Sequence, residues 1–225
     1  MNTVKSALQA IQTRIATAAN AAGRAPDAVQ LLAVSKTFGT DAIRAAVAAG
    51  QRAFGESYVQ EALVKITALA DLSLSWHFIG PVQRNKTRAL AEHFDWVQSV
   101  DRAVIAQRLN DARPATLPPL NVCLQVNISG EASKSGVMPA ELPALAQAVA
   151  QLPRLRLRGL MAIPEAGVDP DLQHAQFRRL RQLCDDLDMP LDTLSMGMSD
   201  DLEAAIAEGA TMVRVGSAIF GRRAK

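Results

Sequence analysis

Short apolar segments alternate with segments of helical periodicity along this chain, and the alternation repeats eight times. Apolar runs of this length fit strands that are buried on both faces, as in a parallel sheet. The predicted strands span residues 31–36, 52–56, 76–80, 96–100, 121–128, 157–163, 193–198 and 212–216. Eight strand–helix units predict an α/β protein folded as a single (β/α)8 TIM barrel.

A doubly wound open sheet produces the same local pattern and is the alternative fold. The barrel is favoured because the eight units contain no dinucleotide-binding glycine fingerprint. A further helix is predicted before the first strand from the helical spacing of Val4, Leu8, Ile11 and Ile15. Residues 1–225 are therefore expected to form one barrel domain with an extra N-terminal helix.

Capping residues and prolines predict where several helices begin. The predicted helix starts are at Thr40, Asp101, Pro139, Asp169 and Ser199. The proline-rich residues 113–119 resemble a linker, but the same strand–helix alternation continues after them. They are therefore predicted to be a loop inside the barrel domain.

The composition excludes several classes of function. A net charge of +2 is too small to indicate a nucleic-acid partner, and no stretch approaches the roughly 20 apolar residues of a membrane span. The two cysteines and three histidines are scattered without metal-ligand spacing, and the N-terminus lacks a signal-peptide core. We expect a cytoplasmic monomer with no metal and no nucleic-acid or membrane partner.

Lys36 stands where the first predicted strand ends, after the apolar residues 31–34 and Ser35. In (β/α)8 barrels the active site lies at the C-terminal ends of the strands. Desolvation of a lysine at such a position favours the neutral amine, the form that reacts to give Schiff bases. The alternative is a lysine whose charged end simply reaches water.

Two glycine-containing segments end the seventh and eighth predicted strands at the same end of the barrel. Residues 195–201 contain Ser199, and residues 214–221 contain Gly216 and Ser217. Each segment combines a serine hydroxyl with the backbone amides of a helix start, which is the make-up of an anion site. Two ordinary helix caps are the alternative. Gly216 and Ser217 are the stronger phosphate candidates, with Ser199 assisting.

Arg214 lies two residues before Gly216, so the two residues share one face of the eighth strand. An arginine that points into a barrel must meet a polar group. A Schiff-base lysine, a phosphate site and an arginine beside the pyridine nitrogen are together what a pyridoxal 5'-phosphate (PLP) site requires.

Segments along the whole chain closely resemble the YggS/PROSC family of pyridoxal phosphate homeostasis proteins. The resembling segments are residues 31–37, 54–61, 76–86, 159–164, 195–201 and 213–221. The resemblance implies a single barrel like the N-terminal domain of alanine racemase and a cofactor carried on the lysine of the first strand. It also implies a role in vitamin B6 and PLP homeostasis without established enzymatic activity.

The resemblance further assigns residues to the cofactor. Lys36 would form the Schiff base, Arg214 would face the pyridine nitrogen, and Ser199, Gly216 and Ser217 would hold the phosphate.

His77 and Met161 would line the pocket. Ser57 occupies a position where many family members have asparagine, so a hydroxyl would have to replace an amide contact to the cofactor.

The resemblance and the residues favour a PLP carrier over an enzyme. An arginine partner leaves the pyridine nitrogen unprotonated, and racemisation needs a base on each face of the α-carbon. Lys36 can supply one base, and Tyr58, the single tyrosine, is expected to pack rather than react. A weak PLP-dependent racemase or related enzyme on a small amino acid, and a barrel aldolase that uses Lys36 without cofactor, are the alternatives.

A carrier would deliver PLP to apo PLP-enzymes. The glycine-bounded loop 130–136 is expected at the same end of the barrel, and it contains Lys134. A second amine accelerates Schiff-base exchange, so Lys134 is a candidate for assisting transfer. An exposed lysine on a flexible loop is the alternative.

Overall fold

The strands form a closed barrel in the computed structural model, which describes residues 3–130, 135–164 and 169–221. The strands of these residues are β1 (Gln30–Val34), β2 (Ala53–Glu56), β3 (Ser75–Phe78), β4 (Trp96–Val100), β5 (Leu120–Gln125), β6 (Leu155–Met161), β7 (Thr193–Ser195) and β8 (Met212–Val215). Each strand pairs in parallel with the next, and β8 pairs with β1 from Gln30–Met212 to Ala33–Val215. The predicted (β/α)8 barrel is confirmed, and this last pairing excludes the open sheet.

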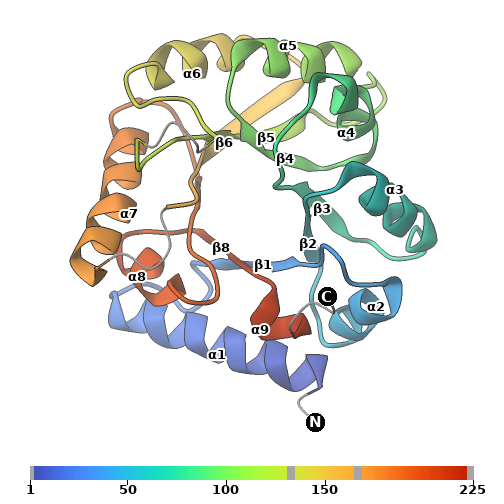
Figure 1. Ribbon diagram of the computed structural model, residues 1–225, viewed down its shortest axis with the longest axis vertical. Helices are drawn as coiled ribbons and strands as arrows, with labels where there is room; N and C mark the ends of the chain where they lie inside the picture. Colours follow the sequence, from blue (N-terminus) through green and yellow to red (C-terminus); the bar gives the residue numbers. More distant parts are fainter. Residues whose placement is uncertain (1–2, 131–134, 165–168, 222–225) are drawn as a thin grey trace.

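Helices surround the barrel, and they follow the strands in sequence (Figure 1). The helices of the described residues are α1 (Val4–Ala21), α2 (Thr40–Ala48), α3 (Val59–Ala68), η1 (Arg84–Lys86, a 3-10 turn), α4 (Thr87–His93), α5 (Ala103–Ala112), α6 (Leu142–Ala150), α7 (Pro170–Asp185), α8 (Leu202–Ala207) and α9 (Ser217–Phe220). The extra N-terminal helix is confirmed as α1, which lies across α8 and α9 where the barrel closes (Figure 1).

Several helix starts differ from the prediction. Asp169 caps α7, and its side chain accepts a hydrogen bond from the Asp171 N–H at 2.9 Å. The other residues that precede helices are Gly39, Arg102, Glu141 and Asp201, in place of the predicted Thr40, Asp101, Pro139 and Ser199. None of these four residues makes a side-chain hydrogen bond to the first amides of its helix, so no capping contact fixes the starts, which lie one or two residues from the predicted ones.

The predicted strands also extend too far at their C-terminal ends. β7 ends at Ser195 rather than at Met198, because Gly197 adopts φ +91° and the chain leaves the sheet there. β5 likewise ends at Gln125. The residues that leave the sheet are the ones available to form a site at this end of the barrel.

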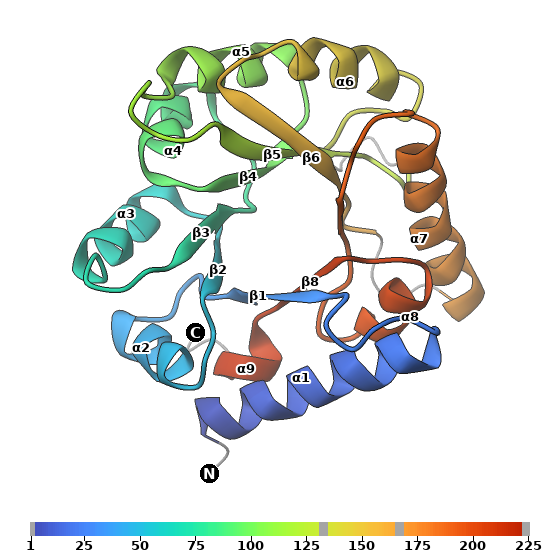
Figure 2. The ribbon, with the colours of Figure 1, turned by 180° about the vertical axis from the view of Figure 1, so that it is seen from behind.

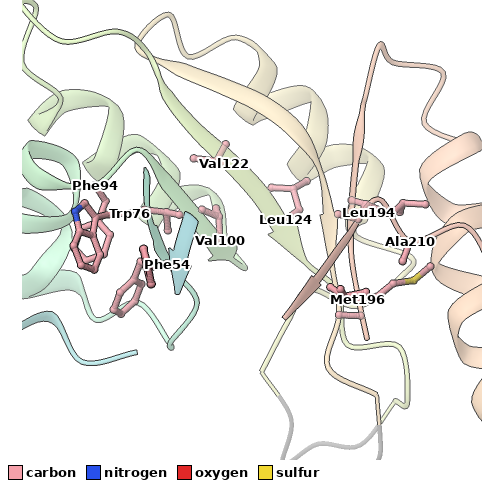
Figure 3. Close-up of a cluster of buried hydrophobic side chains, with 14 of the residues drawn as sticks. Phe54, Trp76, Phe94, Val100, Val122, Leu124, Leu194, Met196 and Ala210 are labelled. Carbon is pink, nitrogen blue, oxygen red and sulfur yellow. The ribbon is translucent and has the colours of Figure 1, made fainter. Parts of the chain in front are cut away.

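The main hydrophobic core lies between the sheet and the helices. Phe54 and Trp76 pack with ring centroids 5.9 Å apart, and Phe94 belongs to the same cluster of buried side chains (Figure 3). Alternate strand residues face this layer or the barrel interior. Leu31 and Ala33 of β1 therefore belong to the outer core, whereas Leu32 packs inside the barrel with Met212.

The barrel interior is filled by side chains, so the opening between the ribbons in Figure 2 is not a channel. Trp96, Cys123 and Met161 form an apolar cluster there. Polar side chains lie beside it, among them the buried Gln98 and Arg214. Because apolar and polar side chains together fill the interior, a ligand is expected at the open end of the barrel.

Candidate functional site

A cavity of about 270 Å³ opens at the C-terminal ends of the strands. The residues that line it are Val34, Lys36, Phe38, Ser57, Ile79, Ile163, Met198, Ser199, Asp200, Arg214, Gly216, Ser217 and Gly221. Six of the eight predicted site residues are among them: Lys36, Ser57, Ser199, Arg214, Gly216 and Ser217. The structure therefore gathers most of the predicted residues into one cavity.

The backbone on both sides of Lys36 is held by side chains from the β2–α3 unit. The Ser35 carbonyl accepts a hydrogen bond from Lys65 Nζ at 2.8 Å, and the Thr37 N–H donates to Glu61 Oε1 at 2.6 Å. Thr37 has φ +71°, which is uncommon for a residue with a branched side chain. Because both neighbours are fixed, the half-buried Lys36 leaves the strand in one defined direction.

Lys65 joins these contacts into a buried charged group. Its ammonium lies 2.7 Å from Glu56 Oε1 and 2.5 Å from Glu61 Oε1, and Ser35 Oγ also donates to Glu56 Oε1 at 2.6 Å. Burial raises the pKa of the Glu56 carboxyl group, although Lys65 and Ser35 act in the opposite direction. The second Glu56 oxygen is buried without a hydrogen-bond partner among the described residues.

The serines of the two predicted phosphate segments come together although they are 18 residues apart. Ser199 Oγ and Ser217 Oγ are 3.5 Å from each other. The backbone on this side is held at two points, because the Met198 N–H donates to Asp201, the residue before α8, and the Ser199 carbonyl accepts from Arg14 Nη2 at 3.1 Å. Two hydroxyl groups at this distance can donate to different oxygens of one anion.

Gly216 permits β8 to end close against β1. A Cβ atom at this position would lie 3.1 Å from the Val34 carbonyl oxygen and 3.3 Å from the Val34 Cβ atom. Glycine therefore brings the backbone that leads to Ser217 next to the strand that leads to Lys36.

Arg214 is 4% exposed and reaches the cavity from β8. Nη1 donates to the Ser195 carbonyl oxygen at 2.6 Å and to Ser195 Oγ at 2.9 Å, and Nη2 donates to the Ala162 carbonyl oxygen at 2.9 Å. Burial lowers the pKa of the guanidinium group to about 10, so Arg214 remains charged at neutral pH. The lining thus holds two cations, Lys36 and Arg214, and one carboxylate, Asp200.

His77 and Met161 do not line the cavity, contrary to the prediction. Both are fully buried inside the barrel, His77 on β3 and Met161 on β6. Residues two apart on a strand share a face, and the next residues on the same faces, Ile79 and Ile163, line the cavity instead. Their depth in the barrel, and not the strand face on which they lie, keeps them out of the cavity.

Other lining residues were missed by the sequence analysis. Phe38, Ile79 and Ile163 give the cavity apolar walls. Their signal was positional, because Ile79 and Ile163 lie at the ends of the predicted strands 76–80 and 157–163 and Phe38 follows the strand 31–36. Ser57 does line the cavity, in a turn that packs against Gly80, where any Cβ atom would overlap the Ser57 carbonyl. Lys134 lies outside the described residues.

The described part of the chain shows neither a metal site nor a membrane span. No group of three or more His, Cys, Asp or Glu residues there could hold a metal ion. None of its helices has the length and apolar character needed to cross a membrane.

A (β/α)8 barrel with a lysine after its first strand and an arginine on its last corresponds to a known class. Residues 6–224 match the family described as alanine racemase, N-terminal domain. The chain belongs to this family and, within it, to the pyridoxal phosphate homeostasis proteins. The protein of that name from Pseudomonas aeruginosa is 66% identical over 223 residues, which cover 99% of this chain and 97% of the relative. That from Escherichia coli K12 is 54% identical, with coverage of 99% and 98%.

Solved structures agree with this assignment. PipY of Synechococcus elongatus, solved with PLP bound, has a TM-score of 0.81 and 41% identity, and the match covers 92% of this chain and all of PipY. Alanine racemase from Corynebacterium glutamicum has a TM-score of 0.67 at 20% identity, with 62% of its length matched. At this identity the racemase shows the shared fold alone.

Proposed function

We propose that this protein binds PLP covalently through Lys36 and takes part in PLP homeostasis as a carrier of the cofactor. The observation that carries the proposal is that Lys36, Arg214, Ser199 and Ser217 line one cavity. The names of the closely related proteins, and the PLP bound in PipY, support the same function.

The groups in the cavity fit the chemistry of PLP. The cofactor supplies an aldehyde that condenses reversibly with an amine, and it also carries an aromatic ring and a phosphate. An amine is present at Lys36, and apolar walls for a ring are present at Val34, Ile79 and Ile163. Cations outnumber carboxylates in the lining, which suits an anionic ligand.

Each polar side chain then has a separate task. Lys36 would provide the covalent link, and Ser199 and Ser217, with the backbone at Gly216, would bind phosphate oxygens. Arg214 would face the ring nitrogen and keep it unprotonated. Asp200, the carboxylate of the lining, is solvent-exposed, so water can screen its repulsion of a phosphate.

A carrier is favoured over a racemase by the ionisable groups of the cavity. Lys36, Asp200 and Arg214 are the ionisable lining residues, and Tyr58 is not among them. Tyr58 precedes α3 and is 54% exposed, so the expectation that it packs is not met, and it does not face the cavity. A weak PLP-dependent activity on a small amino acid is the second candidate, since Lys36 in the cavity can supply one of the two bases that racemisation needs.

The test is to load the purified protein with PLP, record its absorption spectrum, reduce it with borohydride and locate the modified peptide by mass spectrometry. We expect a visible band and modification at Lys36, both lost in Lys36→Ala and retained in a Lys86→Ala control. The absence of a visible band would contradict PLP binding and would favour the alternative of an aldolase that uses Lys36 without cofactor. Modification at another lysine in Lys36→Ala, within the same cavity, would overturn the assignment of Lys36.

Two assays separate carrier from enzyme. Exchange of substrate α-protons with solvent, measured for a panel of amino acids, should be absent for the carrier and present for a racemase. Delivery of PLP to an apo PLP-enzyme should restore that enzyme's activity. The monomeric state and the cytoplasmic location remain predictions, and recipient enzymes are part of this proposal.

A further inference from the structure

A continuous line of hydrogen bonds crosses the barrel interior from Arg214 to Ser75. Arg214 Nη1 lies 2.9 Å from Ser195 Oγ, which lies 2.6 Å from Gln98 Oε1. Gln98 Nε2 lies 2.9 Å from His77 Nδ1, and His77 Nε2 lies 3.0 Å from Ser75 Oγ. Because β4, which carries Gln98, lies across the barrel from β8, this single side chain links opposite walls (Figure 1).

Every bond in this line runs in the same donor-to-acceptor direction. The guanidinium group can only donate, so Ser195 Oγ accepts from it and gives its own proton to Gln98 Oε1. The Gln98 amide then donates to His77 Nδ1, and His77 Nε2–H donates to Ser75. The opposite amide orientation would turn the Gln98 oxygen toward the Met212 sulfur, 3.1 Å away, which the amide N–H now contacts.

His77, which links Gln98 to Ser75 in this line, is kept neutral. Complete burial lowers the pKa of its imidazole to about 3. Its ring stacks on Trp96 with a centroid distance of 5.0 Å and an interplanar angle of 8°. Arg158 covers the Trp96 ring with its guanidinium carbon 4.6 Å from the centroid. A neutral, stacked imidazole is a fixed acceptor for the Gln98 amide.

The line also limits which N–H groups Arg214 can offer to a ligand. A guanidinium group has five N–H groups. Three of them donate to Ser195 O, Ser195 Oγ and Ala162 O, so two are left for other partners. The Ser195 hydroxyl can accept from Arg214 in this geometry because its own proton is taken by Gln98.

We propose that Gln98 is a positioning residue that sets the orientation of Arg214 toward the cavity through Ser195, with His77 as the fixed acceptor of the Gln98 amide. This inference rests on the proposed function, since PLP is the ligand that the oriented Arg214 would contact. Gln98 itself does not line the cavity, so its effect on a bound ring must pass through Arg214.

The test compares PLP-loaded variants by the position of the visible absorption maximum and its pH dependence. Gln98→Met keeps the side-chain length and removes both polar ends. We expect it to move the maximum in the same direction as Arg214→Gln, and to add no further shift when the two changes are combined. Gln51→Met is the matched control, because Gln51 is also buried and its amide donates to Leu31 O and Ala53 O at the opposite end of the barrel.

Loading is measured first, so the two proposals fail in different ways. A wild-type protein without a visible band contradicts the proposed function. A Gln98→Met protein that loads PLP and has the wild-type spectrum and pH profile contradicts the positioning role. If Gln51→Met shifts the maximum equally, the effect is general to buried polar changes and the inference is overturned. If Gln98→Met does not fold, Ser195→Ala replaces it, with the same expected shift and the same contradicting result.

Discussion

The ammonium group of Lys65 donates a hydrogen bond to the backbone carbonyl of Ser35, 2.8 Å away, and Ser35 immediately precedes Lys36. A buried cation on α3 therefore holds the chain at the residue that we expect to bear the cofactor. The same ammonium is neutralised by Glu56 and Glu61. The stability of this charged group and the position of Lys36 are thus linked.

Removal of Lys65 should be strongly destabilising. Lys65→Met would leave the fully buried Glu56 without its cation, and breaking a buried pair in this way costs roughly 3–5 kcal/mol. Urea unfolding should show the loss, and Lys65→Met combined with Glu56→Gln should recover part of it. Arg44→Ala, which removes the exposed pair with Asp71, is the control and should leave the free energy of unfolding nearly unchanged. An equally stable Lys65→Met protein would contradict a structural role for the buried group.

Ser199 and Ser217 should contact the phosphate group of PLP and no other part of the ligand. A hydrogen bond to a charged group is worth about 1.5–3 kcal/mol, so Ser199→Ala and Ser217→Ala should each weaken PLP binding by roughly tenfold or more. The measurement is the equilibrium dissociation constant in a Lys36→Ala background, where binding is noncovalent. Pyridoxal, which lacks the phosphate, should bind with unchanged affinity. A matching loss for pyridoxal would place the serines elsewhere on the ligand, and the exposed Ser73→Ala should change neither value.

Arg214 should govern the electronic state of the bound cofactor more than its attachment. Arg214→Glu would favour a protonated ring nitrogen, whereas Arg214→Gln would remove the charge without offering an acid. Both proteins should still be trapped at Lys36 by borohydride, and both should show altered absorption maxima. An unchanged maximum and pH profile in both variants would mean that Arg214 does not contact the ring.

The buried His77 should make the protein acid-sensitive. The pKa of its imidazole falls from 6.5 to about 3 on burial. Between these pH values the unfolded state binds a proton that the native state does not, so stability falls as pH decreases through this window. The difference of about 3.5 pH units corresponds to roughly 5 kcal/mol at the acid end.

The measurement is the free energy of unfolding of wild type and His77→Gln between pH 7 and pH 3. His77→Gln removes the titrating group, so its stability should fall less steeply with acid than that of wild type. His93→Gln, at an exposed site, should follow the wild-type profile. Parallel profiles for wild type and His77→Gln would show that burial does not suppress protonation of His77.

The barrel could be predicted from the sequence because its signals are local. Periodicity located every strand, and the ends of the first and last strands pointed to Lys36, Arg214 and Gly216. Local periodicity does not predict which residue of an inward-facing strand row is near enough to the open end of the barrel to line the cavity. His77 and Met161 were expected to line the cavity, but they lie deeper in the barrel, and Ile79 and Ile163 line it instead.

Contacts between elements that lie far apart in the sequence could not be predicted from local patterns either. Lys65 lies on the buried side of α3, near Val59 and Ala62, but nothing local shows that Glu56 and the Ser35 carbonyl are placed to receive it. In the sequence, Gln98 and Ser99 are two polar residues in an otherwise apolar strand, and nothing distinguishes Gln98. Its role as a link to Ser195 depends on closure of the barrel, which brings β4 and β7 within reach of one side chain.

The pairing of β1 with β8 has a consequence for biosynthesis. Lys36 leaves the ribosome early, whereas Arg214 and Ser217 emerge among the last residues of the described chain. A nascent chain that has not yet reached β8 has the amine but lacks the arginine and the second serine. The cavity that contains Lys36, Arg214 and Ser217 is therefore complete only after β8 has paired with β1.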